Sequence, residues 1–218
     1  MIQGVIFDMD GLMFDTERIW GECWAPALAK FGLTEKPGFA ADSRGTTGDA
    51  QKAVTRRYYG TAVDADALLA ELTRLAYARF AAGVPKKPGL DGLLAYLRAQ
   101  KIPAAVASSS PEEMIRRNLK NAGIESCFQT VVSGEHIARS KPAPDIFLHA
   151  AALLEVAPAH TLVLEDSFAG VRAGAAGGFV TVMVPDLMQP DAEIQTLYTA
   201  CCASLAEVQQ RLSAGALG

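Results

Sequence analysis

Short apolar runs alternate with helix-length segments from Pro88 to the end of this chain of 218 residues. Strands and helices that alternate along a chain form right-handed crossovers, which place the strands parallel in one sheet with helices on both faces. The sequence therefore predicts an α/β fold with a doubly wound parallel sheet. The expected strands are 2–7, 103–107, 130–132, 161–164 and 179–184, and the expected helices of this part are 90–100, 111–122, 145–156, 169–176 and 203–213.

A helical segment separates the first expected strand from the others. Apolar residues recur at helical spacing over residues 17–31, 48–59 and 64–82, and no strand pattern occurs from Thr16 to about residue 85. We therefore expect an α/β core domain formed by residues 1–15 and 86–218, and an inserted all-helical domain formed by residues 16–85. An insertion joined by two links can close over a site at the sheet and exclude water from it.

Composition excludes several classes of protein. The formal net charge is −4 without any block of like charge, which does not match a nucleic-acid-binding surface or a polybasic membrane anchor. No apolar run reaches the ~20 residues of a membrane helix, and the first residues do not resemble a signal peptide. The four cysteines lack the spacing of a zinc site or a disulfide framework. We expect a cytoplasmic monomer with neither a nucleic-acid nor a membrane partner.

Two carboxylates, Asp8 and Asp10, follow the first strand, with Gly11 directly behind them. Residues two apart on an extended chain point the same way, so both acids would face the crevice at the carboxyl end of the sheet, where open α/β sheets bind ligands. Two converging acids repel each other unless a cation or a shared proton intervenes. The pair therefore predicts a hard cation such as Mg²⁺. The alternative is that these residues only turn the chain.

Polar side chains also follow three later strands. Ser108 and Ser109 follow the strand 103–107, Lys141 comes after the third strand, and Glu165 and Asp166 follow the fourth. The Ser108 hydroxyl and nearby helix amides could hold a phosphate oxygen. Lys141 could balance the charge of several acids and a bound anion. The second pair of acids strengthens the prediction of a cation.

The sequence pattern around Ser110 and around Ser167 predicts helix capping, which is a structural role. Ser110 forms a capping box with Glu113, and Pro111 suits the first helical position, so we expect Ser110 to cap the helix that follows. Asp166 or Ser167 could cap the helix after the fourth strand in the same way. Capping by Asp166 would be compatible with metal binding.

The four segments together resemble the haloacid dehalogenase superfamily, in its branch of phosphatases and β-phosphoglucomutase-like proteins with a helical cap. The matching segments, in order, are FDMDGLMFDTE, ASSS, SKPAPDIF and LEDSFAGVRAG. The resemblance covers nearly the whole chain and implies a Rossmann-like core with a cap. It also implies a Mg²⁺-dependent phosphomonoester hydrolase that acts on a small phosphorylated metabolite, such as a sugar phosphate.

The resemblance also implies roles for individual residues. Asp8 would attack phosphorus and form an aspartyl-phosphate, and Asp10 would exchange protons with the leaving alcohol and the attacking water. The implied metal ligands are Asp8, the backbone carbonyl of Asp10, Asp166 and, as an outer or secondary ligand, Glu165. The implied phosphate-binding residues are Gly11, Ser108, Ser109 and Lys141, of which Lys141 also counts as catalytic.

The cap segment departs from the mutase pattern. Trp20 stands where β-phosphoglucomutases carry a histidine, and Gly48 stands where they carry a phosphate-gripping arginine. These departures favour hydrolysis over a β-phosphoglucomutase-like phosphotransferase, which is the alternative. A non-catalytic phosphate-binding or regulatory protein is a further alternative, although Asp10 would then have no obvious use. Candidates for the substrate side or hinge of the cap are Thr16, Trp20, Trp24, Arg44, Gly45, Thr46 and Thr47; the two tryptophans could equally form the core of the cap.

Overall fold

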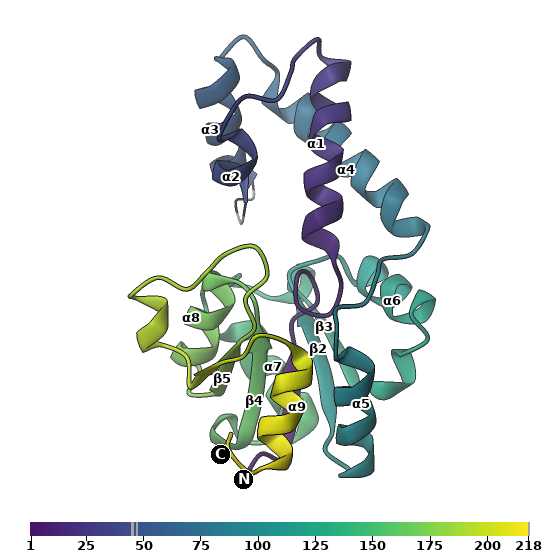
Figure 1. The fold of residues 1–218 in the computed structure, drawn as a ribbon, viewed down its shortest axis with the longest axis vertical. Helices are drawn as coiled ribbons and strands as arrows, with labels where there is room; N and C mark the ends of the chain where they lie inside the picture. The colour runs from purple at the N-terminus through teal and green to yellow at the C-terminus, as the bar shows by residue number, and fades with distance from the viewer. Residues whose placement is uncertain (45, 47, 218) are drawn as a thin grey trace. The chain divides into compact units, whose positions relative to one another are not determined.

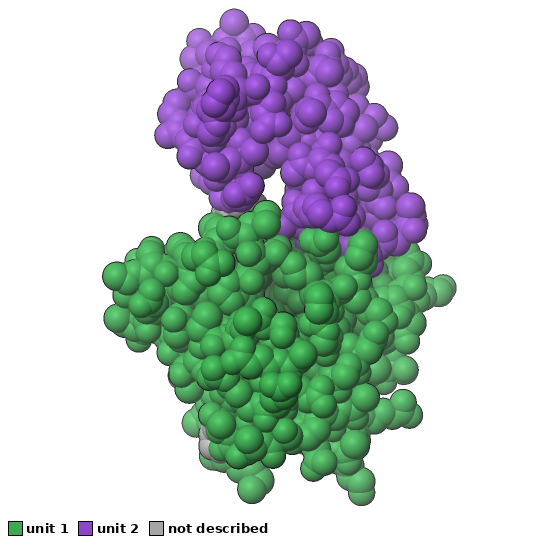
Figure 2. Space-filling view, viewed as in Figure 1, with its two compact units in different colours: residues 1–15, 85–218 green, residues 16–84 purple. Residues whose placement is uncertain are grey.

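The computed structural model describes residues 1–44, 46 and 48–217, and the chain divides into two compact units. Unit 1 consists of residues 1–15 and 85–218, and unit 2 consists of residues 16–84 (Figure 2). Unit 1 contains a parallel sheet with helices, whereas the described residues of unit 2 form helices and no strand. The predicted fold class, a doubly wound α/β core with an inserted helical segment, is therefore confirmed.

The strands of unit 1 form one parallel sheet in the order β3-β2-β1-β4-β5-β6 (Figure 1). Their bounds are β1 Gly4–Phe7, β2 Ala104–Ser108, β3 Thr130–Ser133, β4 Thr161–Glu165, β5 Val180–Met183 and β6 Ala200–Cys201. Phe7 at the end of β1 lies opposite Val106 of β2 and Leu164 of β4. The carboxyl ends of β2, β1 and β4 are therefore neighbours, and the residues that follow them meet at one edge of the sheet.

The helices fall into two groups along the chain. Those of unit 2 are α1 Thr16–Lys30, α2 Phe39–Ser43, α3 Gly48–Tyr59 and α4 Ala65–Ala81. Those of unit 1 are α5 Leu90–Ala99, α6 Glu112–Asn121, α7 Asp145–Leu154, α8 Phe168–Ala176 and α9 Leu205–Ser213, with short 3-10 helices η1 Glu125–Cys127, η2 Gly134–His136, η3 Pro158–His160 and η4 Ile194–Thr196. No helix among the described residues is long and apolar enough to cross a membrane.

The core of unit 1 lies between the sheet and its helices. Ile6 of β1, Ala105 of β2 and Val163 of β4 point to one face, where they pack with Phe147 of α7 and Ala173 of α8. All five side chains are completely buried. Figure 1 shows α5 and α9 in front of the sheet and α7 behind it, so both faces are covered. Burial on both faces explains why the strands are continuous apolar runs rather than alternating ones.

Several short elements were not predicted from the sequence, among them α2 and β6 as well as the 3-10 helices. Helix α2 has five residues and strand β6 has two, and segments of this length do not produce a readable hydrophobic period. The strands β2 and β4 also extend one residue further than predicted, because Ser108 and Glu165 still pair with the neighbouring strands. These two site residues are therefore fixed by the sheet itself.

Aromatic packing dominates the interior of unit 2. Trp24 is buried with its ring centroid 4.7 Å from that of Phe39, and Trp20 is half-buried with its ring centroid 5.6 Å from that of Phe80. Edge-to-face contacts at these distances are favourable beyond the area that they bury. For Trp24 the packing role is therefore favoured over contact with a substrate.

A buried carboxylate joins α1 to α4 in unit 2. Glu71 of α4 is 8% exposed and accepts hydrogen bonds from Lys30 Nζ at 2.7 Å and from Arg74 Nε and Nη2 at 2.9 and 2.6 Å. The hydrogen bonds from Arg74, and next those from Lys30, lower the pKa of Glu71 to about 2. The ionised carboxylate therefore stabilises the folded helical unit.

We expect the Glu71→Gln variant to melt a few degrees below the wild type at pH 7. The pKa of Glu71 is lower in the folded than in the unfolded protein, so its contribution is present above about pH 4.5 and is lost as pH falls toward about 2. The gap in melting temperature should accordingly shrink between pH 5 and pH 2. The exposed Glu35→Gln serves as the control. A gap that stays constant with pH would show that Glu71 does not stabilise the unit through its charge.

The two links between the units are joined to each other inside unit 1. The amide of Asp15 donates to the carbonyl of Pro85 at 2.9 Å, and the amide of Lys87 donates to the carbonyl of Met13 at 2.8 Å. Lys87 Nζ also pairs with Asp186 Oδ1 at 2.6 Å, in the segment that follows β5. The chain therefore leaves and re-enters unit 1 through two paired segments that an ion pair ties to the rest of the domain.

Candidate active site

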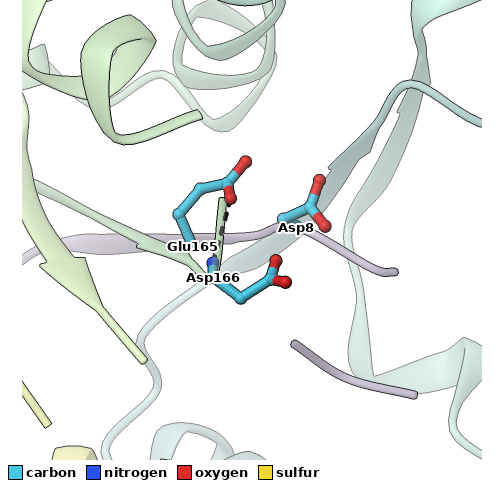
Figure 3. A group of neighbouring side chains, drawn as sticks. All are labelled: Asp8, Glu165 and Asp166. Atoms are coloured by element: carbon cyan, nitrogen blue, oxygen red, sulfur yellow. Dashed lines mark hydrogen bonds between the residues drawn. The ribbon is translucent and has the colours of Figure 1, made fainter. Parts of the chain in front are cut away.

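Three carboxylates converge where β1 and β4 end. Asp8 directly follows β1, Glu165 is the last residue of β4, and Asp166 comes next. Each offers an oxygen that lies within 4.8 Å of the oxygens offered by the others, and Figure 3 shows the three groups facing a common space. All three residues are buried, with at most 9% of their surface exposed. Adjacent parallel strands thus bring together acids that are far apart in the sequence.

Lys141 lies between two of these acids. Its Nζ is 2.5 Å from Asp8 Oδ1 and 2.7 Å from Glu165 Oε1, and it also donates to the carbonyl of Ala107 at 3.3 Å. The lysine side chain is 6% exposed. A buried ammonium needs such partners, because an isolated buried charge is strongly unfavourable. The contacts place a fixed positive charge beside Asp8.

The charges of this cluster alter its protonation. Burial, together with repulsion from Glu165 and Asp10, raises the pKa of Asp8 to about 8, although Lys141 opposes the shift. Burial alone would lower the pKa of Lys141, but the charges of Asp8 and Glu165 outweigh it and raise that pKa. The three carboxylates can therefore carry more negative charge than Lys141 alone neutralises. A cation bound among them would favour the ionised form of Asp8.

Glu165 uses both of its carboxylate oxygens within the protein. Oε1 pairs with Lys141, while Oε2 accepts hydrogen bonds from the amide of Asp166 at 2.9 Å and from the amide and hydroxyl of Ser167 at 2.8 and 2.9 Å. Ser167 in turn caps α8 by accepting from the amide of Gly170 at 3.0 Å. Through these contacts Glu165 holds Lys141 and the turn that presents Asp166. They are compatible with its predicted place as an outer or secondary metal ligand, which stays a prediction.

Two glycines allow the close approach of these groups. A Cβ on Gly170 would lie 1.7 Å from Glu165 Oε1, and a Cβ on Gly11 would lie 2.3 Å from Asp166 Oδ2. Gly11 also has a φ of +81°, a conformation that other residues rarely adopt. Its amide donates to the carbonyl of Phe14 at 3.0 Å. Gly11 therefore packs closely against Asp166, and its predicted contact with phosphate stays a prediction.

Two serine hydroxyls converge on Asp10. Ser108 Oγ donates to Asp10 Oδ2 at 3.2 Å, and Ser110 Oγ donates to the same oxygen at 2.7 Å. Ser108 is completely buried at the end of β2, and Ser109 is the exposed residue after it. The hydroxyls of Ser108 and Ser110, at and just after the end of β2, thus lie beside Asp10, the second acid after β1.

The predicted capping box of Ser110 and Glu113 is wrong. Helix α6 begins at Glu112, and its N-cap residue is Pro111, which makes no side-chain capping bond. The hydroxyl of Ser110 donates to a carboxylate instead, and hydrogen bonds to charged groups are stronger than those between neutral groups. Ser110 is therefore a site residue that the sequence pattern assigned to the helix.

The candidate cap residues belong to unit 2. Thr16 is the buried first residue of α1, Trp20 is half-buried among aromatic rings, and Arg44 is the exposed residue after α2. Thr46 Oγ donates to the carbonyl of Ser43. The candidates Gly45 and Thr47 lie outside the described residues. The role of this group toward a substrate stays a prediction.

The acid cluster fits a hard divalent cation. Asp8 and Asp166 offer carboxylate oxygens, the ligand type that Mg²⁺ prefers over nitrogen or sulfur. The excess negative charge described above also favours a cation at this position. Enzymes that act on phosphate groups use a metal site, fixed positive charge and hydrogen-bond donors to stabilise the phosphoryl group. This site offers oxygen ligands, an ammonium and hydroxyls for these purposes.

The sequence matches that of a known family over the same elements. The profile of the family described as haloacid dehalogenase-like hydrolase covers residues 5–184. The chain belongs to this family. The family match confirms the predicted membership. Together with the phosphatases described next, it also confirms the predicted enzyme class, phosphoric monoester hydrolase.

Several phosphatases resemble this haloacid dehalogenase-like hydrolase. The bifunctional riboflavin kinase/FMN phosphatase of Arabidopsis thaliana is 31% identical over 84% of this chain, and hexitol phosphatase A of Escherichia coli strain K12 is 32% identical over 84%. The match spans 48% of the plant protein and 82% of the bacterial one. The chain thus corresponds to about half of the plant enzyme.

A solved structure shows the same fold at low sequence identity. The crystal structure of a putative β-phosphoglucomutase from Thermotoga maritima superimposes with a TM-score of 0.82, covering 98% of this chain and 99% of that one at 23% identity. At this identity the likeness supports the architecture of the haloacid dehalogenase-like hydrolase, with its core and inserted helical unit, and not a particular reaction.

Proposed function

We propose that this haloacid dehalogenase-like hydrolase is a Mg²⁺-dependent phosphatase that hydrolyses a small phosphorylated metabolite, such as a sugar phosphate, through an aspartyl-phosphate. The observation that carries the proposal is the position of Lys141 Nζ between Asp8 and Glu165, with Asp166 next to them. The resemblance to hexitol phosphatase A supports the substrate class.

Asp8 is the nucleophile of the proposed reaction. One of its carboxylate oxygens forms a bond to phosphorus while the bond from phosphorus to the substrate alcohol breaks. Lys141 and the Ser108 hydroxyl bind the phosphoryl oxygens, where charge must be stabilised during transfer. Asp10 gives a proton to the departing oxygen and then takes one from the water that cleaves the aspartyl-phosphate. Phosphate and the free alcohol are released.

Mg²⁺ would be held by Asp8, Asp166 and the backbone carbonyl of Asp10. When bound, it would supply positive charge that aligns the phosphoryl group and offsets the repulsion between the phosphate and the carboxylates. The proposed substrate-facing side of unit 2, the monomeric state and the cytoplasmic location remain predictions from the sequence. Hydrolysis is preferred to the mutase reaction because Trp20 and Gly48 stand at the positions that differ from mutases.

A panel of phosphorylated metabolites tests the proposed function. We expect Mg²⁺-dependent phosphate release from one or more sugar or polyol phosphates, a fall of at least about 10²-fold in chelator, and recovery when Mg²⁺ is added back. Turnover that survives thorough chelation would contradict the metal assignment. Isomerisation of β-glucose 1-phosphate with a bisphosphate primer, faster than phosphate release, would favour the mutase. A panel without any metal-dependent activity would point to the non-catalytic alternative.

A further inference from the structure

Asp10 accepts hydrogen bonds from two serine hydroxyls on the same oxygen. Ser110 donates at 2.7 Å and Ser108 at 3.2 Å. We propose that Ser110 is a positioning residue for Asp10. It holds the Asp10 carboxylate when the Ser108 hydroxyl shifts its hydrogen bond from Asp10 to the phosphoryl group. This inference rests on the proposed function, in which Asp10 moves protons and Ser108 binds phosphate.

Ser108 cannot serve Asp10 and a phosphoryl oxygen with one proton. A serine hydroxyl has a single O–H to donate. The amide of Ser110 already donates to Ser108 Oγ at 3.0 Å, so the oxygen of that hydroxyl acts as an acceptor and its proton goes to Asp10. When Ser108 donates to a bound phosphoryl group, its hydrogen bond to Asp10 must break. Of the two hydroxyls, Ser110 then remains to orient the acid.

The main chain of Ser110 is itself held in place. Ser133, at the end of β3, donates from Oγ to the carbonyl of Ser110 at 2.8 Å, and it is 1% exposed. Ser133 Oγ also accepts from the amide of Glu135 at 3.1 Å. A side chain on such a fixed segment can hold its partner in one position, which is the requirement for a proton donor aligned with a leaving oxygen.

The proposal predicts an effect that depends on the leaving group. During attack by Asp8, the bond from phosphorus to the leaving oxygen breaks, and Asp10 supplies the proton that this oxygen needs when it belongs to an alkyl alcohol. The leaving group of p-nitrophenyl phosphate is stable without a proton. A poorly positioned Asp10 should therefore slow transfer from an alkyl phosphate and hardly affect transfer from p-nitrophenyl phosphate.

The test compares kcat/KM of both substrates for the Ser110→Ala and Ser110→Thr variants with Mg²⁺ present. For Ser110→Ala we expect a fall of about 10- to 100-fold with the best alkyl phosphate of the panel and less than about 3-fold with p-nitrophenyl phosphate. Ser110→Thr keeps the hydroxyl and should recover most of the loss. Inhibition by inorganic phosphate should be unchanged, since Ser110 is not placed on the phosphate. Ser213→Ala is the matched control, and melting temperatures establish that each variant is folded.

Three results would overturn the proposal. Equal losses with both substrates, or an inhibition constant for phosphate that rises in parallel, would mean that Ser110 contacts phosphate or only maintains the fold. A wild-type profile for Ser110→Ala would mean that Ser110 has no part in the reaction. The Asp10→Asn variant distinguishes a failure of the Ser110 role from a failure of the proposed function. If the loss depends on the leaving group in Asp10→Asn but not in Ser110→Ala, only the role of Ser110 fails. Without that dependence in Asp10→Asn, the acid/base assignment itself fails.

Discussion

Replacing Asp8 by Asn is expected to lower phosphate release by on the order of 10⁴-fold or more, because the amide cannot attack phosphorus. The substitution hardly changes the shape of the side chain, and it removes an acid whose pKa burial has raised to about 8. Because the pKa of Asp8 is higher in the folded than in the unfolded protein, the metal-free fold loses stability as pH rises from about 4 to about 8. Asn has no charge to bury and avoids this loss. We expect the variant in chelator to melt no lower than the wild type.

The measurement pairs steady-state phosphate release with rapid quenching and mass spectrometry. The wild type should carry a transient phosphoryl group on the peptide that contains Asp8, and the Asp8→Asn variant should carry none. Asp49→Asn, whose side chain is fully exposed in unit 2, is the control for the chemical change. Substantial turnover by a clean Asp8→Asn preparation, or a phosphoryl group on another peptide, would refute the nucleophile assignment.

Replacing Gly170 by Ala should disable the site without touching any proposed catalytic residue. The new Cβ would lie 1.7 Å from Oε1 and 1.9 Å from Cδ of Glu165, so Glu165 must move. Its movement would displace Lys141, which donates to that oxygen at 2.7 Å. A displacement on the scale of an ångström in such a site costs on the order of 10²-fold in rate. Overpacking a buried site costs about 1–3 kcal/mol of stability.

A second glycine-to-alanine substitution provides the control for Gly170→Ala. Gly21 lies within α1, and a Cβ there would meet nothing within 4 Å. Gly21→Ala should keep full activity and stabilise the helix by up to about 1 kcal/mol. The measurements are kcat/KM and thermal unfolding for both variants. If Gly170→Ala retained wild-type activity, the contact between Glu165 and Lys141 would not be needed for catalysis.

Most of the fold could be predicted because its signals are local. The run Val5–Phe7 and the later strand 161–164 are short and apolar, and both form buried strands close to the predicted bounds. The cap of α4 is local in the same way, since Asp64 accepts a hydrogen bond from the amide of Ala67 at 3.0 Å, three residues along the chain. The sequence contained no comparable signal for β6, a two-residue pairing at the edge of the sheet that depends on β5 for its existence.

The site was predictable in its membership more than in its contacts. The sequence placed Asp8 and Asp166 at strand ends and Lys141 in the segment after the third strand, and the structure brings the three together. It could not assign Ser110, because the local pattern of a capping box is complete while the acceptor that the hydroxyl uses is 100 residues away in the chain. The sequence also could not show that both carboxylate oxygens of Glu165 accept hydrogen bonds, one from Lys141 and the other from the amides that follow β4.

The hydrogen bonds that join the two links also fix the place where unit 2 is inserted. Because Asp15 is hydrogen-bonded to Pro85 and Met13 to Lys87, the chain closes a loop within unit 1 before unit 2 begins. An insertion whose ends already meet adds little strain to its host, whatever its own length. A change of length or sequence in the helical unit therefore leaves the register of β1, and with it the position of Asp8, as it is.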